Sequence, residues 1–168
     1  VGIPGEHGAN YYATRAAMQE AGLGESDVTI SPIGYTQQAA IASGQVDAVV
    51  GFTNNDAVQM RLAGLEIREI PLDPSHTPLV SASIITTDAM NAIAADPQIA
   101  IDATKPWDDS LASEESLAAA NAVLAATVPL WLGDDAHADG VQDLATWSSM
   151  VSFLNSIGVL EGDVDPTV

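Results

Sequence analysis

Near its start the chain contains a short turn whose residue types could bind a polar ligand. It places two glycines around a carboxylate and an imidazole, in the order Pro4-Gly5-Glu6-His7-Gly8. Glycine permits positive φ and close backbone approach to a ligand, and free N–H groups at the start of a following helix can bind an oxygen-rich or polar group. The spacing matches neither the dinucleotide-binding fingerprint nor a phosphate-binding loop. We expect a ligand-binding turn, and an ordinary strand-to-helix connection stays open as the alternative.

Two further polar stretches follow predicted strands. The first, GFTNND, has three uncharged polar side chains in a row: Thr53, Asn54 and Asn55. Uncharged amides suit an amide-like or heteroaromatic ligand, although Asn54 would also serve as an ordinary helix N-cap. The second, Gly34–Gln37, places Tyr35 where it could stack on a planar ligand. Ligands bind at the carboxyl ends of parallel strands, so three polar loops at one such edge favour a binding site more than any one of them alone.

The sequence offers little for catalysis or for a resident metal or cofactor. It contains no cysteine, and its histidines, His7, His76 and His137, lack the spacing of a metal site. No Gly-x-Ser-x-Gly motif is present, and the single lysine, Lys105, precedes a proline in a predicted loop. We therefore expect binding without turnover, no cofactor and no metal.

The chain is strongly acidic: four basic residues against 23 acidic ones give its 168 residues a net charge of −19. Nucleic acids and anionic membrane surfaces attract Lys and Arg, so neither is expected as a partner. The apolar residues, 47% of the chain, form no run of the about 18 residues that a membrane span needs. The chain starts without Met inside an apolar run, which suggests a processed or truncated product.

Residues 1–88 alternate apolar runs with helix-like segments. Strands are expected at Val1–Pro4, Val28–Ile33, Ala48–Phe52, Ile67–Leu72 and Val80–Thr86. Helices, each followed by a glycine, are expected at Ala9–Ala21, Thr36–Ser43 and Asn54–Ala63. Alternating strands and helices predict right-handed crossovers and a mostly parallel sheet flanked by helices. The predicted fold class is therefore α/β.

The second half of the chain changes character. Two helices are expected, one from a cap at Ser113 through Val128 and one from a cap at Asp143 to a stop at Gly158. The segment Pro97–Asp109 indicates an apolar stretch followed by a turn. We expect 1–95 to form an α/β ligand-binding lobe and 96–168 an all-helical C-terminal segment.

Several motifs resemble those of the periplasmic substrate-binding proteins of ABC transporters, especially the type that binds thiamine-precursor pyrimidines. They are GIPGEHG, the pattern A-x-x-x-G-x-V-D-A-x-x-G from Ala40 to Gly51, the following Asn54-Asn55, and TWSSMVSFLNSIGVLEGDVDP near the end. The Glu6-His7-Gly8 step resembles the Gly-Glu-aromatic-Gly loop of the pyrimidine branch. Such proteins have two α/β lobes that close on a ligand by a hinge. The resemblance implies that this chain is the second lobe plus helices that return to a first lobe, which is missing upstream.

The resemblance implies a solute-binding component of an ABC importer that carries a small planar nutrient, of the thiamine-precursor type, to a permease. Its location would be extracytoplasmic. Riboflavin and alkylsulfonates or nitrate are alternative ligands, and anions rank lower because Arg15, Arg61 and Arg68 lie away from the predicted loops. Related fungal enzymes use a cysteine-rich motif and a lysine-bound pyridoxal phosphate, so a chain without cysteine is not expected to be an enzyme. An alternative of another class is an orphan lobe that acts as an interaction module and self-associates through an exposed helical face.

The resemblance also implies roles for individual residues. Gly5 and Gly8 would bring backbone donors close to the ligand, and Glu6 would accept hydrogen bonds from an amino group or a ring N–H. The other residues expected to contact the ligand are His7, Asn10, Tyr11, Tyr35, Thr53, Asn54 and Asn55.

Overall fold

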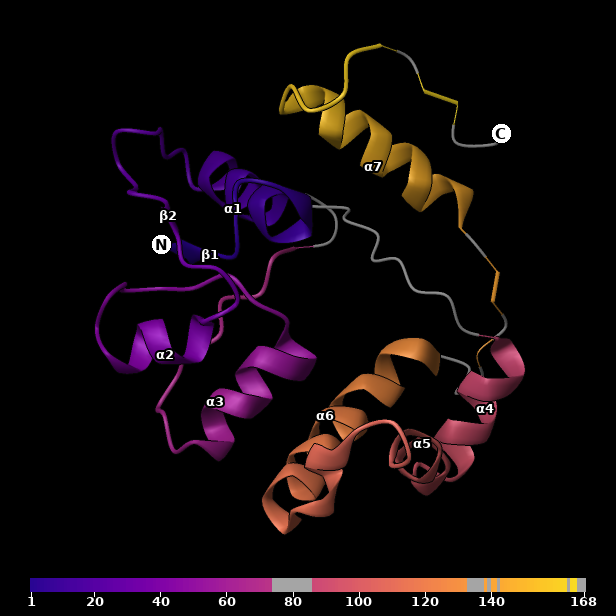
Figure 1. The fold of residues 1–168 in the computed structure, drawn as a ribbon. Helices are drawn as coiled ribbons and strands as arrows, with labels where there is room; N and C mark the ends of the chain where they lie inside the picture. The colour runs from indigo at the N-terminus through magenta and orange to yellow at the C-terminus, as the bar shows by residue number, and fades with distance from the viewer. Residues whose placement is uncertain (74–85, 133–137, 139, 142, 163, 166–168) are drawn as a thin grey trace. The chain divides into compact units, whose positions relative to one another are not determined.

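The computed structural model describes residues 1–73, 86–132, 138, 140–141, 143–162 and 164–165 (Figure 1). The chain divides into two compact units. The first unit comprises Val1–Gly51, Ile70–Ala82 and Gln142–Val168, and the second comprises Phe52–Glu69 and Ser83–Val141. These units differ from the expected division between 1–95 and 96–168, which refers to the lobes of a longer type of protein and stays a prediction.

The first unit contains a small parallel sheet. β1 (Gly2–Ile3) pairs in parallel with β2 (Ser31–Pro32), and Gly2 also forms a parallel bridge with Val49. Hydrogen bonds run from β1 to both neighbours: the N–H of Ser31 donates to the Val1 carbonyl at 2.9 Å, and the N–H of Gly2 donates to the Ala48 carbonyl at 2.8 Å. β1 is therefore the central strand, and all three chain segments run in the same direction.

Close packing at β1 explains its residue types. Ile3 has 0% of its surface exposed and is the largest fully buried side chain among the described residues. A Cβ atom at Gly2 would lie 2.7 Å from Cδ1 of Ile33, a separation that real Cβ atoms essentially never show. A larger residue at position 2 would therefore force the side chain of Ile33, the residue after β2, to shift.

The sheet is smaller than the sequence predicts, and the described part of the chain is mostly helical (Figure 1). The expected strands at 1–4 and 28–33 are present as the short β1 and β2, and the expected strand at 48–52 is reduced to the bridge at Val49. The strand expected at Ile67–Leu72 is wrong, because Pro71 has no N–H to donate and the Glu69 carboxylate pairs with Arg61 instead. The strand expected at Val80–Thr86 falls, apart from Thr86, outside the described residues.

The helices expected in the first unit are confirmed as α1 (Gly8–Glu20), α2 (Gln37–Ala42) and α7 (Leu144–Ser156). Each is followed by a glycine in the left-handed region, with φ of 68°, 69° and 71° at Gly22, Gly44 and Gly158. These glycines end the helices because other residues adopt positive φ only with strain. Asp143 caps α7, since its carboxylate accepts a hydrogen bond from the Ala145 N–H at 2.9 Å.

The described part of the second unit is helical. Its elements are η1 (Thr53–Ala57, a π-helix), α3 (Val58–Leu62), α4 (Thr87–Ala95), α5 (Gln98–Thr104), η2 (Asp109–Ala112, a 3₁₀-helix) and α6 (Glu114–Leu132). α6 contacts η1, α3, α4 and η2, so it is the element on which this unit packs. The buried apolar side chains of the unit are Ala57, Met60, Ile101, Leu111 and Ala138.

Three of the sequence predictions concern this unit, two of them helices and one a turn. The helix expected at 54–63 is present as η1 followed by α3, and the one expected at 113–128 is present as the longer α6. The Ser113 hydroxyl caps α6 by accepting a hydrogen bond from the Ser116 N–H at 3.1 Å. The segment expected to be an apolar stretch and a turn, 97–109, contains the helix α5, because Ile101 is buried on one side of it.

α6 is also long and apolar enough to cross a membrane by length and composition alone, with a mean hydropathy of 1.3 over its best window. The predicted absence of an uninterrupted apolar run of that length still holds, because polar residues interrupt α6; its mean hydropathy is high because alanines separate its larger apolar residues. One such helix is weak evidence for a membrane span. α6 contacts η1, α3, α4 and η2, but none of the residues in that window is fully buried within the structure.

Candidate functional site

The first unit brings two of the predicted loops to one edge of its sheet. β1 ends at Ile3 and leads into the turn Pro4–Gly8, while β2 ends at Pro32 and leads into Gly34 and Tyr35. Because the strands are parallel, both loops leave from their carboxyl ends, where α/β sheets bind ligands. The sequence prediction of a shared edge therefore agrees with the pairing of these two strands.

The turn Pro4–Gly8 leaves its polar side chains free. Glu6 and His7 are exposed, and neither forms a hydrogen bond or ion pair within the described part of the chain. His7 occupies the N-cap position of α1 but its side chain accepts no hydrogen bond from the helix, and the first turn contains no acidic residue. The N–H groups at the start of α1 are therefore not capped by a side chain, so an acceptor group of a ligand could approach them.

The geometry of the turn explains why positions 5 and 8 are both glycine. Gly8 has φ of +72°, a conformation that strains any residue with a side chain. A Cβ atom at Gly5 would lie 2.6 Å from Cε1 of His7, so glycine allows the imidazole to lie over the backbone. The turn is thus shaped by its two glycines, as the sequence predicts.

Two residues of α1 that are expected to contact the ligand, Asn10 and Tyr11, also make contacts within the protein. Asn10 is buried, and its Nδ2 donates a hydrogen bond to the Val50 carbonyl at 3.3 Å, which ties α1 to the segment beside β1. Tyr11 is half-buried and lies edge-on to Tyr12, with ring centroids 5.7 Å apart. Asn10 therefore positions the helix that carries the turn, and its contact with a ligand stays a prediction.

The ring of Tyr35 is strongly exposed. Tyr35 is 86% exposed and follows Gly34, whose φ is +63°. The Thr36 hydroxyl donates to the Ile33 carbonyl at 2.6 Å and closes the turn beneath the tyrosine. An aromatic ring that is nearly free of protein contacts can stack on a planar molecule without losing packing elsewhere.

The remaining predicted residues, Thr53, Asn54 and Asn55, lie in η1 of the second unit. The carboxylate of Asp56 accepts a hydrogen bond from the Phe52 N–H at 2.7 Å and holds the start of this π-helix. The alternative role of Asn54 as an N-cap is wrong, because Phe52 occupies that position and Asn54 lies inside the helix. π-Helical segments are rare and are frequent at functional sites, so the predicted segment has an unusual backbone of the kind that ligands exploit.

Side chains of η1 are held by neighbouring elements of the second unit. The Nδ2 of Asn54 donates to Oγ1 of Thr127 in α6 at 2.9 Å. Hydrogen bonds from Arg61 and, second, from Thr53 lower the pKa of Glu69 below its ordinary value. Asn55 is exposed and makes no side-chain hydrogen bond with any described residue. The segment therefore offers Asn55 and part of Asn54 to a ligand, while Thr53 is engaged.

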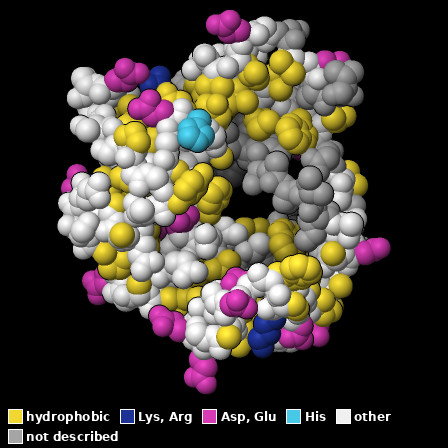
Figure 2. All heavy atoms as spheres, in the orientation of Figure 1, with side chains coloured by type: hydrophobic (Ala, Val, Ile, Leu, Met, Phe, Trp, Pro, Cys, Tyr) yellow, Lys and Arg dark blue, Asp and Glu magenta, His cyan; other side chains and the backbone are white. Residues whose placement is uncertain are grey.

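Two of the four basic side chains pair with carboxylates, whereas Arg68 and Lys105 form no ion pair with a described residue. Arg15 pairs with Glu25 at 2.7 Å, and this hydrogen bond raises the pKa of Arg15. Arg61 pairs with Glu69. On the face shown in Figure 2, acidic side chains are dispersed and only a few basic ones lie among them. An anionic ligand would have to compete with internal carboxylates for these guanidinium groups.

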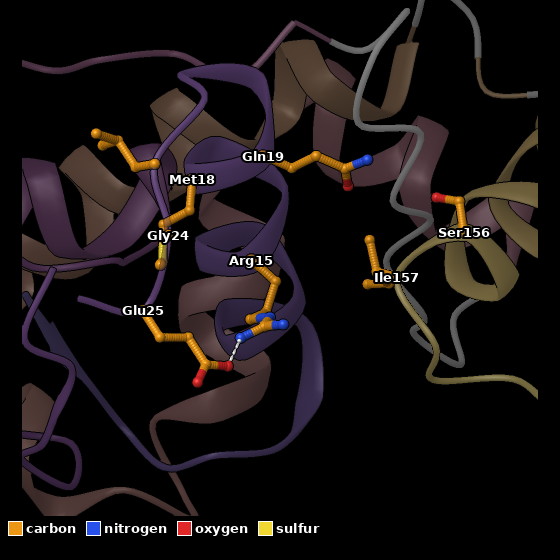
Figure 3. A pocket seen from close by; sticks show the side chains of 8 residues that line it. Arg15, Met18, Gln19, Gly24, Glu25, Ser156 and Ile157 are labelled. Carbon is orange, nitrogen blue, oxygen red and sulfur yellow. Dashed lines mark hydrogen bonds and ion pairs between the residues drawn. The ribbon is translucent and has the colours of Figure 1, made fainter. Parts of the chain in front are cut away.

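A pocket of about 320 Å³ lies in the first unit, away from the strand edge (Figure 3). Its walls come from the second half of α1, the loop after it and the end of α7: Arg15, Met18, Gln19, Leu23, Gly24, Glu25, Ser156 and Ile157. The Arg15–Glu25 ion pair forms part of the wall, as Figure 3 shows. The pocket shares no residue with the predicted site, and the turn Pro4–Gly8 lies at the opposite end of α1.

Sequence reasoning missed two residues that support η1. Asp56 holds its first turn, and Thr127 holds the Asn54 amide from a position 73 residues further along the chain. The only local signal for Thr127 is a hydroxyl within the apolar stripe of α6, next to Val128. Among the described residues, no three His, Asp or Glu side chains group in a way that could hold a metal ion.

The chain is similar in sequence to known proteins. The family model described as NMT1/THI5 like matches residues 1–100. The chain is 27% identical over 187 aligned positions to the riboflavin-binding protein RibY of Chloroflexus aurantiacus, an alignment that covers 98% of the chain and 52% of that relative. The chain thus spans about half the length of the relative. No solved structure matches the chain. The resemblance found in GIPGEHG and in the motif from Ala40 to Gly51 is confirmed, and the chain belongs to the NMT1/THI5-like family.

Proposed function

We propose that this chain belongs to the solute-binding component of an ABC importer and binds a small planar nutrient without chemical conversion. The observation that carries the proposal is the strand edge of the first unit. There, the free side chains of Glu6 and His7, the uncapped start of α1 and the exposed Tyr35 ring follow the carboxyl ends of parallel strands. Membership of the NMT1/THI5-like family and the riboflavin-binding relative support the same role.

The proposed ligand is a flat heterocycle that carries N–H donors and is not an anion. Glu6 accepts hydrogen bonds from an amino or ring N–H, and Gly5 and Gly8 let backbone N–H groups approach ring acceptors. Tyr35 stacks on the ring, and His7 and Tyr11 border it. Asn54 and Asn55 contribute amide groups from their own unit, whereas Thr53 supports that segment through Glu69.

Two ligands fit this description, a thiamine-precursor pyrimidine and riboflavin. The pyrimidine carries an amino group next to a ring nitrogen, and riboflavin carries an imide N–H on a three-ring system. The relative named as a riboflavin-binding protein favours the second ligand as strongly as the family match favours the first. Alkylsulfonates and nitrate fit less well, because Arg15 and Arg61 are already paired with carboxylates.

The proposed partner is the permease of the importer, and the proposed location is outside the cytoplasm. With a net charge of −19, the chain has no electrostatic attraction for nucleic acids or anionic membrane surfaces. The proposal needs no cofactor, because the residues at the strand edge bind a ligand rather than activate it.

A second candidate function is an interaction module that associates through apolar side chains. Leu130 of α6 is 69% exposed and Trp107 is 89% exposed, which favours a partner surface. Light scattering at increasing concentration tests this candidate. A mass that rises above 17.3 kDa with concentration supports it, and a constant monomer mass contradicts it.

A thermal-shift screen of the 168-residue chain tests the main proposal. The panel contains riboflavin, a hydroxymethylpyrimidine with an amino group, taurine and nitrate, at low and at high salt. A ligand that binds only the folded chain raises the melting temperature by mass action. We expect a shift from one of the two heterocycles that persists at high salt. Shifts from taurine or nitrate alone, or from none of the four, would contradict the proposal.

A further inference from the structure

A two-step hydrogen-bond relay fixes the side chain of Asn54. Its Nδ2 donates to Oγ1 of Thr127 at 2.9 Å, and the Thr127 hydroxyl donates to the Val123 carbonyl at 2.8 Å. Thr127 and Val123 belong to α6, and Asn54 belongs to η1, so the relay connects two packed elements of the second unit. All three residues lie in the described part of the chain.

The relay decides which end of the Asn54 amide faces Thr127. A hydroxyl group has one hydrogen to donate, and the Thr127 hydrogen is used by the Val123 carbonyl. The oxygen of Thr127 can then only accept, so the atom opposite it must be the NH₂ group of Asn54. This argument fixes the orientation through the hydrogen-bond network, which is the proper basis for assigning an amide.

The amide oxygen of Asn54 is therefore directed away from Thr127. It has no hydrogen-bond partner within the described residues, and Asn54 is only half-buried. The backbone around it is held separately, because the Asp56 carboxylate accepts a hydrogen bond from the Phe52 N–H at 2.7 Å. Backbone and side chain are thus both fixed before any ligand arrives, which reduces the entropy lost on binding.

We propose that Thr127 is a positioning residue that presents the Asn54 carbonyl oxygen as a hydrogen-bond acceptor for an N–H group of the ligand. This inference rests on the proposed function and makes it more specific. A fixed acceptor selects imide or amino heterocycles over analogues in which that N–H is methylated, because a buried acceptor left without a donor costs affinity. A free Asn54 amide would rotate to suit either a donor or an acceptor and would not select.

The test compares Thr127→Val, which keeps the shape but removes the hydroxyl, with Thr127→Ser, which keeps the hydroxyl. Affinities are measured by titration calorimetry for riboflavin and 3-methylriboflavin, and for the aminopyrimidine and its dimethylamino analogue. In the unmodified chain we expect the N–H form of one pair to bind more tightly than its methylated form. Thr127→Val should reduce this preference by about tenfold, and Thr127→Ser should retain it. The steric cost of the methyl group is the same in the original chain and in both variants, so it cancels when their preferences are compared.

Other outcomes separate the possible failures. An unchanged preference in Thr127→Val, even with a lower melting temperature, would show that the relay only packs α6 on η1 and would overturn the inference while the proposed function stands. If Thr127→Val does not fold, Asn54→Ala takes its place and should lose the preference in the same way; a retained preference there overturns the inference as well. If the unmodified chain binds neither pair, the proposed function fails and the inference fails with it.

Discussion

The turn Pro4–Gly8 of the first unit and the π-helical segment Thr53–Ala57 of the second unit hold their polar side chains in opposite ways. The turn is shaped by its backbone: two glycines, the end of β1 and the start of α1 fix its path. Its side chains Glu6 and His7 form no hydrogen bond or ion pair within the described chain. In the π-helical segment, by contrast, side chains are engaged with the protein through Asp56, Asn54 and Thr53.

This difference indicates how the two segments would contribute to recognition. A turn with free side chains adapts to the ligand, and the entropy of ordering Glu6 and His7 is lost on binding. A segment whose amide is already held loses less entropy and discriminates more sharply between donors and acceptors. We expect affinity to depend mainly on the turn, and selectivity to depend mainly on Asn54.

Glu6→Ala is the substitution with the largest expected effect on affinity, and it tests the contribution of the turn. The variant removes a charged acceptor that has no partner in the described structure, so affinity for the heterocycle should fall by about 1.5–3 kcal/mol. Stability toward urea should not change. The matched control is Glu25→Ala, which removes an exposed carboxylate beside Arg15, away from the turn, and should leave affinity unchanged. Equal affinity losses in both variants would point to net charge rather than to the turn.

Gly8→Ala tests whether the backbone shapes the turn. At φ of +72° an alanine is strained, so we expect the free energy of unfolding to fall by about 1–2 kcal/mol. Gly24→Ala is the control, because a Cβ there makes only an ordinary contact, 3.5 Å from an Asp27 carboxylate oxygen, and needs no positive φ. Urea unfolding followed by circular dichroism measures the free energy of unfolding of both variants. A Gly8→Ala variant as stable as the original chain would contradict the role of the backbone.

Tyr35→Ala tests the stacking contribution at the same edge. The ring is 86% exposed, so its loss should hardly affect stability but should weaken binding by about 0.5–1.5 kcal/mol. Tyr35→Phe keeps the ring and should bind as the original chain does. A loss of affinity in the phenylalanine variant would show that the hydroxyl, rather than the ring, contacts the ligand.

The smallest expected effect is on the pH dependence of stability, and it concerns how the first turns of α1 and α7 are capped. α1 begins without a side-chain cap, whereas the Asp143 carboxylate caps α7. Hydrogen bonds from Thr146 and then from the Ala145 N–H lower the pKa of Asp143 below its ordinary value. Because the folded pKa is the lower one, this stabilisation is present above about pH 4 and is lost as the pH falls through the folded value. Asp143→Asn keeps the cap without the titration. Stability measured from pH 5 to pH 2 should therefore fall less steeply in Asp143→Asn, and identical profiles would contradict this role.

The sequence predicts those elements that depend on local signals. α1, α2 and α7 end where glycines take positive φ, and the Asp143 cap depends on neighbouring residues only. The sheet is predicted less well, since a parallel strand needs partners far along the chain, and at Ile67–Leu72 the proline and the ion pair outweigh the apolar pattern. Thr127 could not be predicted, because its contact with Asn54 joins residues 73 positions apart.

Titration calorimetry with riboflavin and with the hydroxymethylpyrimidine, on the original chain and on Glu6→Ala, tests the central claim most directly. The account predicts saturable binding of one heterocycle to the original chain and binding weakened at least tenfold in the variant. Equal affinity in both proteins would contradict the role of the turn. The absence of binding to either heterocycle would contradict the proposed function itself.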